Sequence, residues 1–176
     1  NSSKFMASGG VGLTYNDGEN YIGFSLDKLE AVYGMPGPEG EENMTSLNPT
    51  KNTANFQSSF SLDNNYFNKF NLQGAVSEYN HSERTGSGNN HNINFFSDLY
   101  EIKTSLNHKS IIDTNNEGLI GFHFQNYDQG ALGQEESHLV HTRTSSFALF
   151  ALESFNFDLF DLDVGGRVES VNLKNT

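Results

Sequence analysis

The chain has 176 residues, enough for one domain with a sizeable core, and it contains no Cys for a disulfide or a thiolate metal site. Asp and Glu outnumber Lys and Arg by 22 to 10. The resulting net charge of -12 repels phosphate backbones, so no nucleic-acid partner is expected. No run of about 18 apolar residues is present, which excludes a membrane-spanning helix. Membrane-spanning strands remain open, because a strand needs only every second residue to be apolar.

Eight segments alternate apolar with polar residues. In 157–173, for example, Leu162 and Val164 flank Asp163. Successive side chains of a strand point to opposite faces, so this pattern predicts one apolar and one polar face. No segment is a convincing helix, and 27–34 (DKLEAVYG) comes closest to one. In chain order, the predicted strands are 9–15, 21–27, 56–62, 70–81, 100–107, 119–126, 142–153 and 157–173.

Short and long connections alternate between these segments. A tight turn is expected at 16–20 (NDGEN). The long connections are 35–54, 83–93 and 128–141, and the other short ones are 63–68, 110–117 and 154–158. Alternate connections of an antiparallel meander emerge at opposite ends, and short turns at one end with long loops at the other are typical of outer-membrane barrels. The predicted fold is therefore all-β: an antiparallel up-and-down meander of about eight strands, a partial segment of a large transmembrane β-barrel.

This fold predicts the face on which each side chain lies. The lipid side is expected to carry Ile22, Phe24, Phe60, Leu62, Leu72, Ile102, Ile120, Phe122, Phe124, Leu162 and Val164. The lumen side is expected to carry Gln57, Gln73, Lys103, His123, Asp161, Arg167 and Glu169. The alternative is a soluble β-sandwich that serves as a binding or adhesion module, in which the first set would be buried between two sheets.

Two stretches resemble TonB-dependent outer-membrane receptors. YGMPG (33–37) is similar to a YG-x-PG stretch in the barrels of these receptors. Residues 126–155 resemble a segment in which a loop with an ALG-EE core leads into T-x-[ST]-x-x-x-LF-x-x-E. The stretches SEYNHSE, NINFFSDLYEIKTSLNHK and GLIGFHFQ follow in matching order between them. The resemblance extends over roughly residues 10–173 and is closest to the zinc-uptake branch.

The resemblance implies a receptor of the bacterial outer membrane with a barrel of about 22 strands occluded by a plug domain. Residues 1–176 would be a partial barrel domain without the plug and the remaining strands. The implied partners are outer-membrane lipid, a metal ion or metal chelate as cargo, and an energy-coupling protein that acts only through the missing plug. Zinc is the leading cargo, as a transported ligand, and no cofactor is expected.

The sequence also departs from the zinc branch. Receptors of that branch often carry a His- and Asp-rich insertion after YG-x-PG, whereas 38–55 (PEGEENMTSLNPTKNTAN) has no His or Cys. A receptor for a siderophore or another chelate is therefore the nearest alternative. A self-contained eight-stranded outer-membrane protein is a third, which the lack of a closing C-terminal aromatic residue disfavours.

The candidate metal ligands gather at the long-loop end. They are His81, His91, Glu135, Glu136, His138 and His141. Zinc accepts imidazole nitrogen and carboxylate oxygen, so this set is chemically sensible. For each residue taken alone, a solvated loop side chain is the alternative. His123 is expected in mid-strand as a hydrogen-bonded wall residue, and His108 lies near a short turn with no evident role.

No catalytic constellation is recognisable. Glu135 and Glu136 are adjacent and point apart in an extended chain, so they cannot form an acid/base pair. The glycine-rich stretches 9–12 and 86–88 lack the Lys-Ser/Thr of a phosphate loop. The chain is not expected to be an enzyme.

Overall fold

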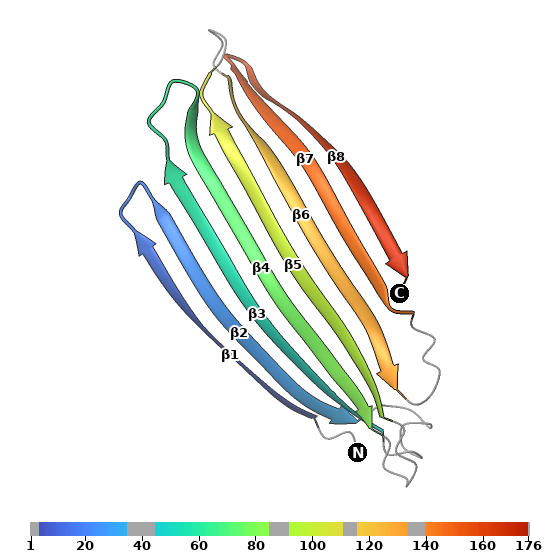
Figure 1. Cartoon of the computed structure of the whole chain (residues 1–176). Helices are drawn as coiled ribbons and strands as arrows, with labels where there is room; N and C mark the ends of the chain where they lie inside the picture. The colour runs from blue at the N-terminus through green and yellow to red at the C-terminus, as the bar shows by residue number, and fades with distance from the viewer. Residues whose placement is uncertain (1–3, 35–44, 85–91, 111–115, 134–139, 176) are drawn as a thin grey trace.

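The chain forms one open antiparallel sheet of eight strands (Figure 1). The computed structural model describes residues 4–34, 45–84, 92–110, 116–133 and 140–175. The strands are β1 (Lys4–Asn16), β2 (Tyr21–Gly34), β3 (Ser46–Ser61), β4 (Phe67–Arg84), β5 (Asn92–His108), β6 (Asn116–Gly133), β7 (Thr142–Phe157) and β8 (Phe160–Asn175). Each strand pairs only with its neighbours in sequence, and β1 and β8 are the two edges. The predicted meander is confirmed, and its open form is consistent with a segment of a barrel.

The sheet is a single layer. A sandwich would need two sheets packed face to face, whereas all eight strands belong to one sheet. Among the described residues the only buried apolar side chains are Ala31 and Ala148, and every described residue of β1 and β8 is exposed. No helix long enough and apolar enough to cross a bilayer occurs in the described part of the chain.

The register assigns the two faces. Residues opposite each other in the ladder share a face, and Ile22 is connected in this way through Leu72 and Phe122 to Val168. We call this side the apolar face and the opposite side the polar face. All the residues predicted to meet lipid that lie in strands are on the apolar face, and none of them is buried. All seven residues predicted for the lumen are on the polar face. The predicted separation of the two sets is therefore confirmed.

A row of polar residues bounds the apolar face towards the ends of β2, β4 and β6. Successive register pairs join its members: Gly9, Lys28, Asn52, Glu78, Asp98, Asp128, Arg143 and Lys174. We call it the polar row. On β1–β5 the next residue of this face, towards the middle of the strand, is apolar, for example Leu26 or Val76. On β6–β8 the corresponding residues are polar, namely Asn126, Ser145 and Asn172. The apolar band thus slants relative to the rows, as it must if the strands are tilted with respect to the band.

The strands are longer than the alternating segments of the sequence. β3 begins at Ser46 and includes Pro49, although 35–54 was predicted to be a loop. Pro49 has no N–H to donate, and the pairing between β2 and β3 is interrupted at this residue. On its other side Pro49 remains paired with His81 of β4. Because of such extensions the strict alternation of connection lengths fails: 109–115 is as long as 85–91.

The β1–β2 turn is held by the side chain of Asp17. Its Oδ1 accepts hydrogen bonds from the backbone N–H groups of Asn20 (2.6 Å) and Glu19 (3.0 Å). Gly18 lies between Asp17 and Glu19 with φ of 95°, a left-handed conformation that glycine adopts without steric cost. The expected tight turn at 16–20 is confirmed.

Candidate functional site

A chain of charged side chains crosses the middle of the polar face. His123 of β6 lies between Glu101 of β5 and Arg167 of β8. Its Nε2 is 2.9 Å from Glu101 Oε1, and its Nδ1 is 3.1 Å from Arg167 Nη2. A guanidinium can only donate, so Nδ1 accepts and Nε2 carries the proton. Arg167 also contacts Glu169 at 3.1 Å. The expected hydrogen-bonded role of His123 is confirmed, and its partners fix one neutral tautomer.

Small residues let this chain of contacts pass over intervening strands. Ala148 of β7 lies between the strands of His123 and Arg167 and is buried. Gly121 of β6 plays the same role nearby, because a Cβ there would meet the Phe150 ring at 2.2 Å. The Lys103 ammonium lies 5.3 Å from the centre of that ring. The middle of the polar face is thus a surface of mutually oriented cationic, anionic and aromatic groups.

His81 lies on the polar face near the end of β4 that the candidate metal site was predicted to occupy. Its ring stacks on Phe95 with centroids 4.5 Å apart and planes inclined by 12°, and Tyr79 lies 5.6 Å away. Its Nε2 is 3.8 Å from Glu83 Oε1. Its Nδ1 is buried and has no hydrogen-bond partner among the described residues. Neighbouring protein atoms cover this nitrogen, so a ligand that approaches His81 would meet the Nε2 side of the ring, next to Glu83.

His141 lies on the other face of the sheet. Its Nε2 is 2.5 Å from Asp128 Oδ1, and its ring packs edge-on against Phe96. Arg143 donates two hydrogen bonds to Asp128 Oδ2, at 2.6 and 3.0 Å. Asp128, Phe96 and Arg143 all belong to the apolar face by register. His141 thus helps to join β6 to β7 at the polar row.

The two described members of the predicted metal set are therefore separated by the sheet. His81 is on the polar face and His141 on the apolar face. The other four, His91, Glu135, Glu136 and His138, lie outside the described residues. Within the ranges that the structure describes, no three His, Asp or Glu side chains lie together as a metal site requires. The metal set as a whole stays a prediction, and a ligand that binds His81 could not reach His141.

His108, for which no role is evident from the sequence, joins β5 to β7. His108 is 3% exposed on the apolar face at the last residue of β5. Its Nδ1 faces the Lys109 carbonyl oxygen at 2.9 Å and its Nε2 faces Glu153 Oε1 at 2.8 Å. Both nitrogens meet acceptors, so the ring is a cation in this arrangement. Glu153 also accepts a hydrogen bond from Asn116 at 3.4 Å. This polar group bounds the apolar band at the end opposite the polar row.

The described side chains thus place an oriented chain of polar contacts in the middle of the polar face and a stacked imidazole towards one end. No protein-family model matches the chain, and no curated protein sequence is significantly similar to it.

Proposed function

We propose that this chain is part of the barrel of a TonB-dependent receptor in the bacterial outer membrane, which takes up a metal ion or metal chelate. The observation that carries the proposal is the apolar band: it covers one face of a single-layered sheet, no other described element covers it, and it has a polar border on both sides. A soluble protein rarely exposes so large an apolar surface.

The width of the band fits a bilayer. On β5 the apolar face carries Asp98 at one border and His108 at the other, with Tyr100, Ile102 and Leu106 between them. The borders are ten positions apart, which is about 34 Å along a strand and about 26 Å along the bilayer normal for a tilt of about 40°. That height agrees with the apolar band of about 25 Å of outer-membrane barrels. The slant of the band across the rows is what tilted strands in a bilayer require.

The polar face then lines the lumen, and the cargo passes along it. Metal transport is favoured by the acidic net charge of -12 and by the position of His81 next to Glu83 on the polar face. Zinc remains the leading cargo on the resemblance to zinc-uptake receptors. A siderophore receptor of the same family is the second candidate, and the ring stack of His81 on Phe95 favours it, because planar groups stack well on such a surface.

Membrane location is tested by fractionating cells that make the full-length protein. We expect it in the outer-membrane fraction, retained after washing with urea or carbonate and released only by detergent. Recovery in the soluble fraction, or release by urea alone, would show that the apolar band is covered by protein and would overturn the proposal.

The cargo is tested by calorimetric titration of zinc into the full-length receptor. Alanine at His81 should weaken binding, since its ring lies next to Glu83 on the polar face, whereas alanine at His141 should leave the affinity unchanged, since that ring lies on the other face. Variants of His91 and His138 extend the test to the loops. If zinc does not bind at all, the hypothesis of a chelate receptor is the better one. The result of the fractionation experiment is unaffected.

A further inference from the structure

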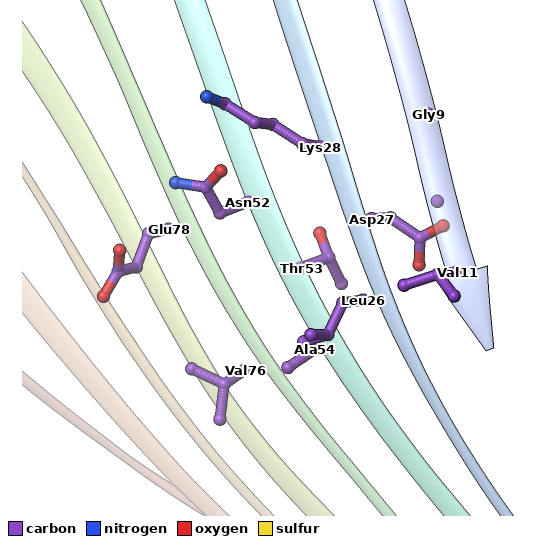
Figure 2. Close-up of a pocket in the computed structure, with 11 residues that line it drawn as sticks. Gly9, Val11, Leu26, Asp27, Lys28, Asn52, Thr53, Ala54, Val76 and Glu78 are labelled. Atoms are coloured by element: carbon purple, nitrogen blue, oxygen red, sulfur yellow. The ribbon is translucent and has the colours of Figure 1, made fainter. Parts of the chain in front are cut away.

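The sheet carries hollows on both of its faces. On the apolar face, a groove of about 580 Å³ lies where the apolar band meets the polar row (Figure 2). Figure 2 shows Asn52 between the Lys28 ammonium and the Glu78 carboxylate at its rim. Lys28 is also 2.5 Å from Glu30, so the one ammonium of the rim is already balanced by carboxylates. This groove therefore indicates no particular ligand, and the polar face offers a better defined hollow.

A smaller hollow of about 320 Å³ lies on the polar face, over β3, β4 and β5. Register places Ala75 of β4 between Asn55 and Glu101, and its methyl group is too short to fill the space between their side chains. We call this space the Ala75 hollow. Its volume falls within the range of about 300–1,000 Å³ that is usual for small-molecule sites. The polar-face side chains that line it are Asn55, Gln57, Gln73, Ala75, Glu101 and Lys103.

Amide groups form one side of the Ala75 hollow. Gln57 and Gln73 lie opposite each other in the ladder between β3 and β4, and both are exposed. Neither side chain makes a hydrogen bond to another residue within the part of the chain that the structure describes. Asn55 differs, because its amide donates to Ser25 Oγ at 3.2 Å and to Asp27 Oδ2 at 3.4 Å. The two glutamines thus each keep two N–H donors and one carbonyl acceptor for a ligand.

The charged groups on the other side are held in place from outside the hollow. Glu101 Oε1 is 2.9 Å from His123 Nε2, and Arg167 contacts the other nitrogen of that ring at 3.1 Å. The Lys103 ammonium lies 5.3 Å from the centre of the Phe150 ring. Glu101 retains its second oxygen as an acceptor, and Lys103 retains its N–H donors. Both groups are oriented before a ligand arrives, which reduces the entropy lost on binding.

The charges of the Ala75 hollow select a neutral ligand. Its lining contains one ammonium and one carboxylate, both from β5. An anion attracted by Lys103 would be repelled by Glu101, and a cation would meet the reverse. A ligand that donates and accepts hydrogen bonds without carrying a charge avoids both penalties. Hydroxyl groups do so, since each has one donor and two acceptor lone pairs.

We propose that the Ala75 hollow binds a neutral saccharide, whose hydroxyl groups bond to the two glutamine amides and to the charged pair of β5. A sugar ring carries hydroxyl groups around its whole edge and can reach all four groups at once, whereas an extended peptide directs its groups to alternate sides. The hollow lies on the face opposite the apolar band, so the sugar of a membrane lipid could not reach it and the ligand is a free saccharide. The inference goes beyond metal uptake and needs only water at the polar face.

Three variants remove the binding groups or the space while leaving the backbone ladder intact. Gln57→Ala and Gln73→Ala each take away one amide, and Ala75→Leu fills the hollow. Gln129→Ala is the matched control, because Gln129 also lies on the polar face, opposite Ser97, but does not line the hollow. None of the substituted residues is buried, so every variant should fold.

The experiment is saturation-transfer NMR on the full-length protein in a sugar-free detergent, with D-glucose as the probe. We expect the wild type and Gln129→Ala to bind D-glucose with equal affinity. The dissociation constant should rise at least about threefold in Gln57→Ala and in Gln73→Ala, as expected for one lost hydrogen bond. In Ala75→Leu it should rise at least about tenfold, because the space itself is filled. D-Gluconate and protonated D-glucosamine, which carry a charge of either sign, should bind more weakly than D-glucose.

Contrary results would separate the parts of this inference. No binding of D-glucose to the wild type, or equal affinity in all variants, would overturn the site. Tighter binding of D-gluconate or D-glucosamine, with the same response to the variants, would overturn the assignment to a neutral ligand. Tighter binding of acetyl-triglycine amide would overturn the saccharide in favour of a peptide. None of these results bears on the membrane location, which the fractionation experiment tests by itself.

Discussion

The two faces of the sheet share every strand and every ladder hydrogen bond, yet they are organised differently. On the polar face, side chains from different strands meet in directed contacts, as in the chain from Glu101 through His123 to Arg167. Within the apolar band, neighbours meet through rings, as Phe122 and Phe147 do at 4.6 Å. Directed contacts hold the side chains of the polar face in fixed positions relative to one another. The apolar face needs only an apolar environment, so it tolerates irregular hollows that side chains would fill in a protein core.

The largest expected effect comes from placing a charge in the apolar band. Leu149 lies in the middle of the band and is 59% exposed, so Leu149→Arg removes little packing within the sheet. In a bilayer the change should lower the free energy of unfolding by about 2–4 kcal/mol, because the charged guanidinium would lie near the midplane, where there is no water to solvate it. The measurement is urea unfolding of the full-length protein folded into lipid vesicles.

The matched control for this change is Gln57→Arg on the polar face, where Gln57 is already exposed. It should change the free energy of unfolding by less than about 0.5 kcal/mol. Equal costs at the two positions would show that the faces do not differ in environment and would contradict the membrane arrangement.

A smaller effect is expected from the charge chain of the polar face. In a double-mutant cycle, Glu101→Ala and His123→Ala should show a coupling free energy of about 1 kcal/mol, because each change leaves the other group without its hydrogen bond. The pair Gln73→Ala and His123→Ala serves as the control and should show no coupling. No coupling between Glu101 and His123 would mean that their hydrogen bond of 2.9 Å is not maintained in solution.

The smallest effect belongs to the β1–β2 turn. Hydrogen bonds from the backbone N–H of Asn20, from its side-chain amide and from the backbone N–H of Glu19 hold the pKa of Asp17 below its usual value of 3.8. A carboxyl group whose pKa is lowered by folding stabilises the folded state at pH values above its usual pKa. This stabilisation is lost as the pH falls through the lowered pKa. Asp17→Ala should therefore lower the urea midpoint slightly at pH 7 and leave it unchanged at pH 2. A difference that persists at pH 2 would point to another cause.

Alternation alone was sufficient to predict the faces, since a strand leaves each side chain only two directions. His123 was placed on the correct face in this way. Strand ends were predicted less well. Residues 27–34, the closest to a helix in the sequence, form the second half of β2. Pro49 suggested a loop but is tolerated because its missing N–H coincides with a lapse in the ladder to β2.

Contacts between strands could not be predicted from alternation. The bond between His123 and Arg167 joins residues 44 apart and depends on the register of two hairpins and on the small size of Ala148 between them. The role of His108 depends likewise on Glu153, two strands away. His141 precedes β7, so no parity could be assigned to it, and only its contacts with Asp128 and Phe96 place it on the apolar face.

The strictly sequential order of the strands has an energetic consequence. Contacts between elements are concentrated between neighbours in sequence, from β1–β2 to β7–β8. The backbone ladder therefore gives each strand two neighbours at most, as in repeat proteins, where the free energy is close to a sum of nearest-neighbour terms. Low sequence separation of contacts also favours hairpin-by-hairpin assembly, in which each new strand adds to an edge already formed. Substitutions on strands three or more apart, such as β2 and β6, should then change the free energy of unfolding additively.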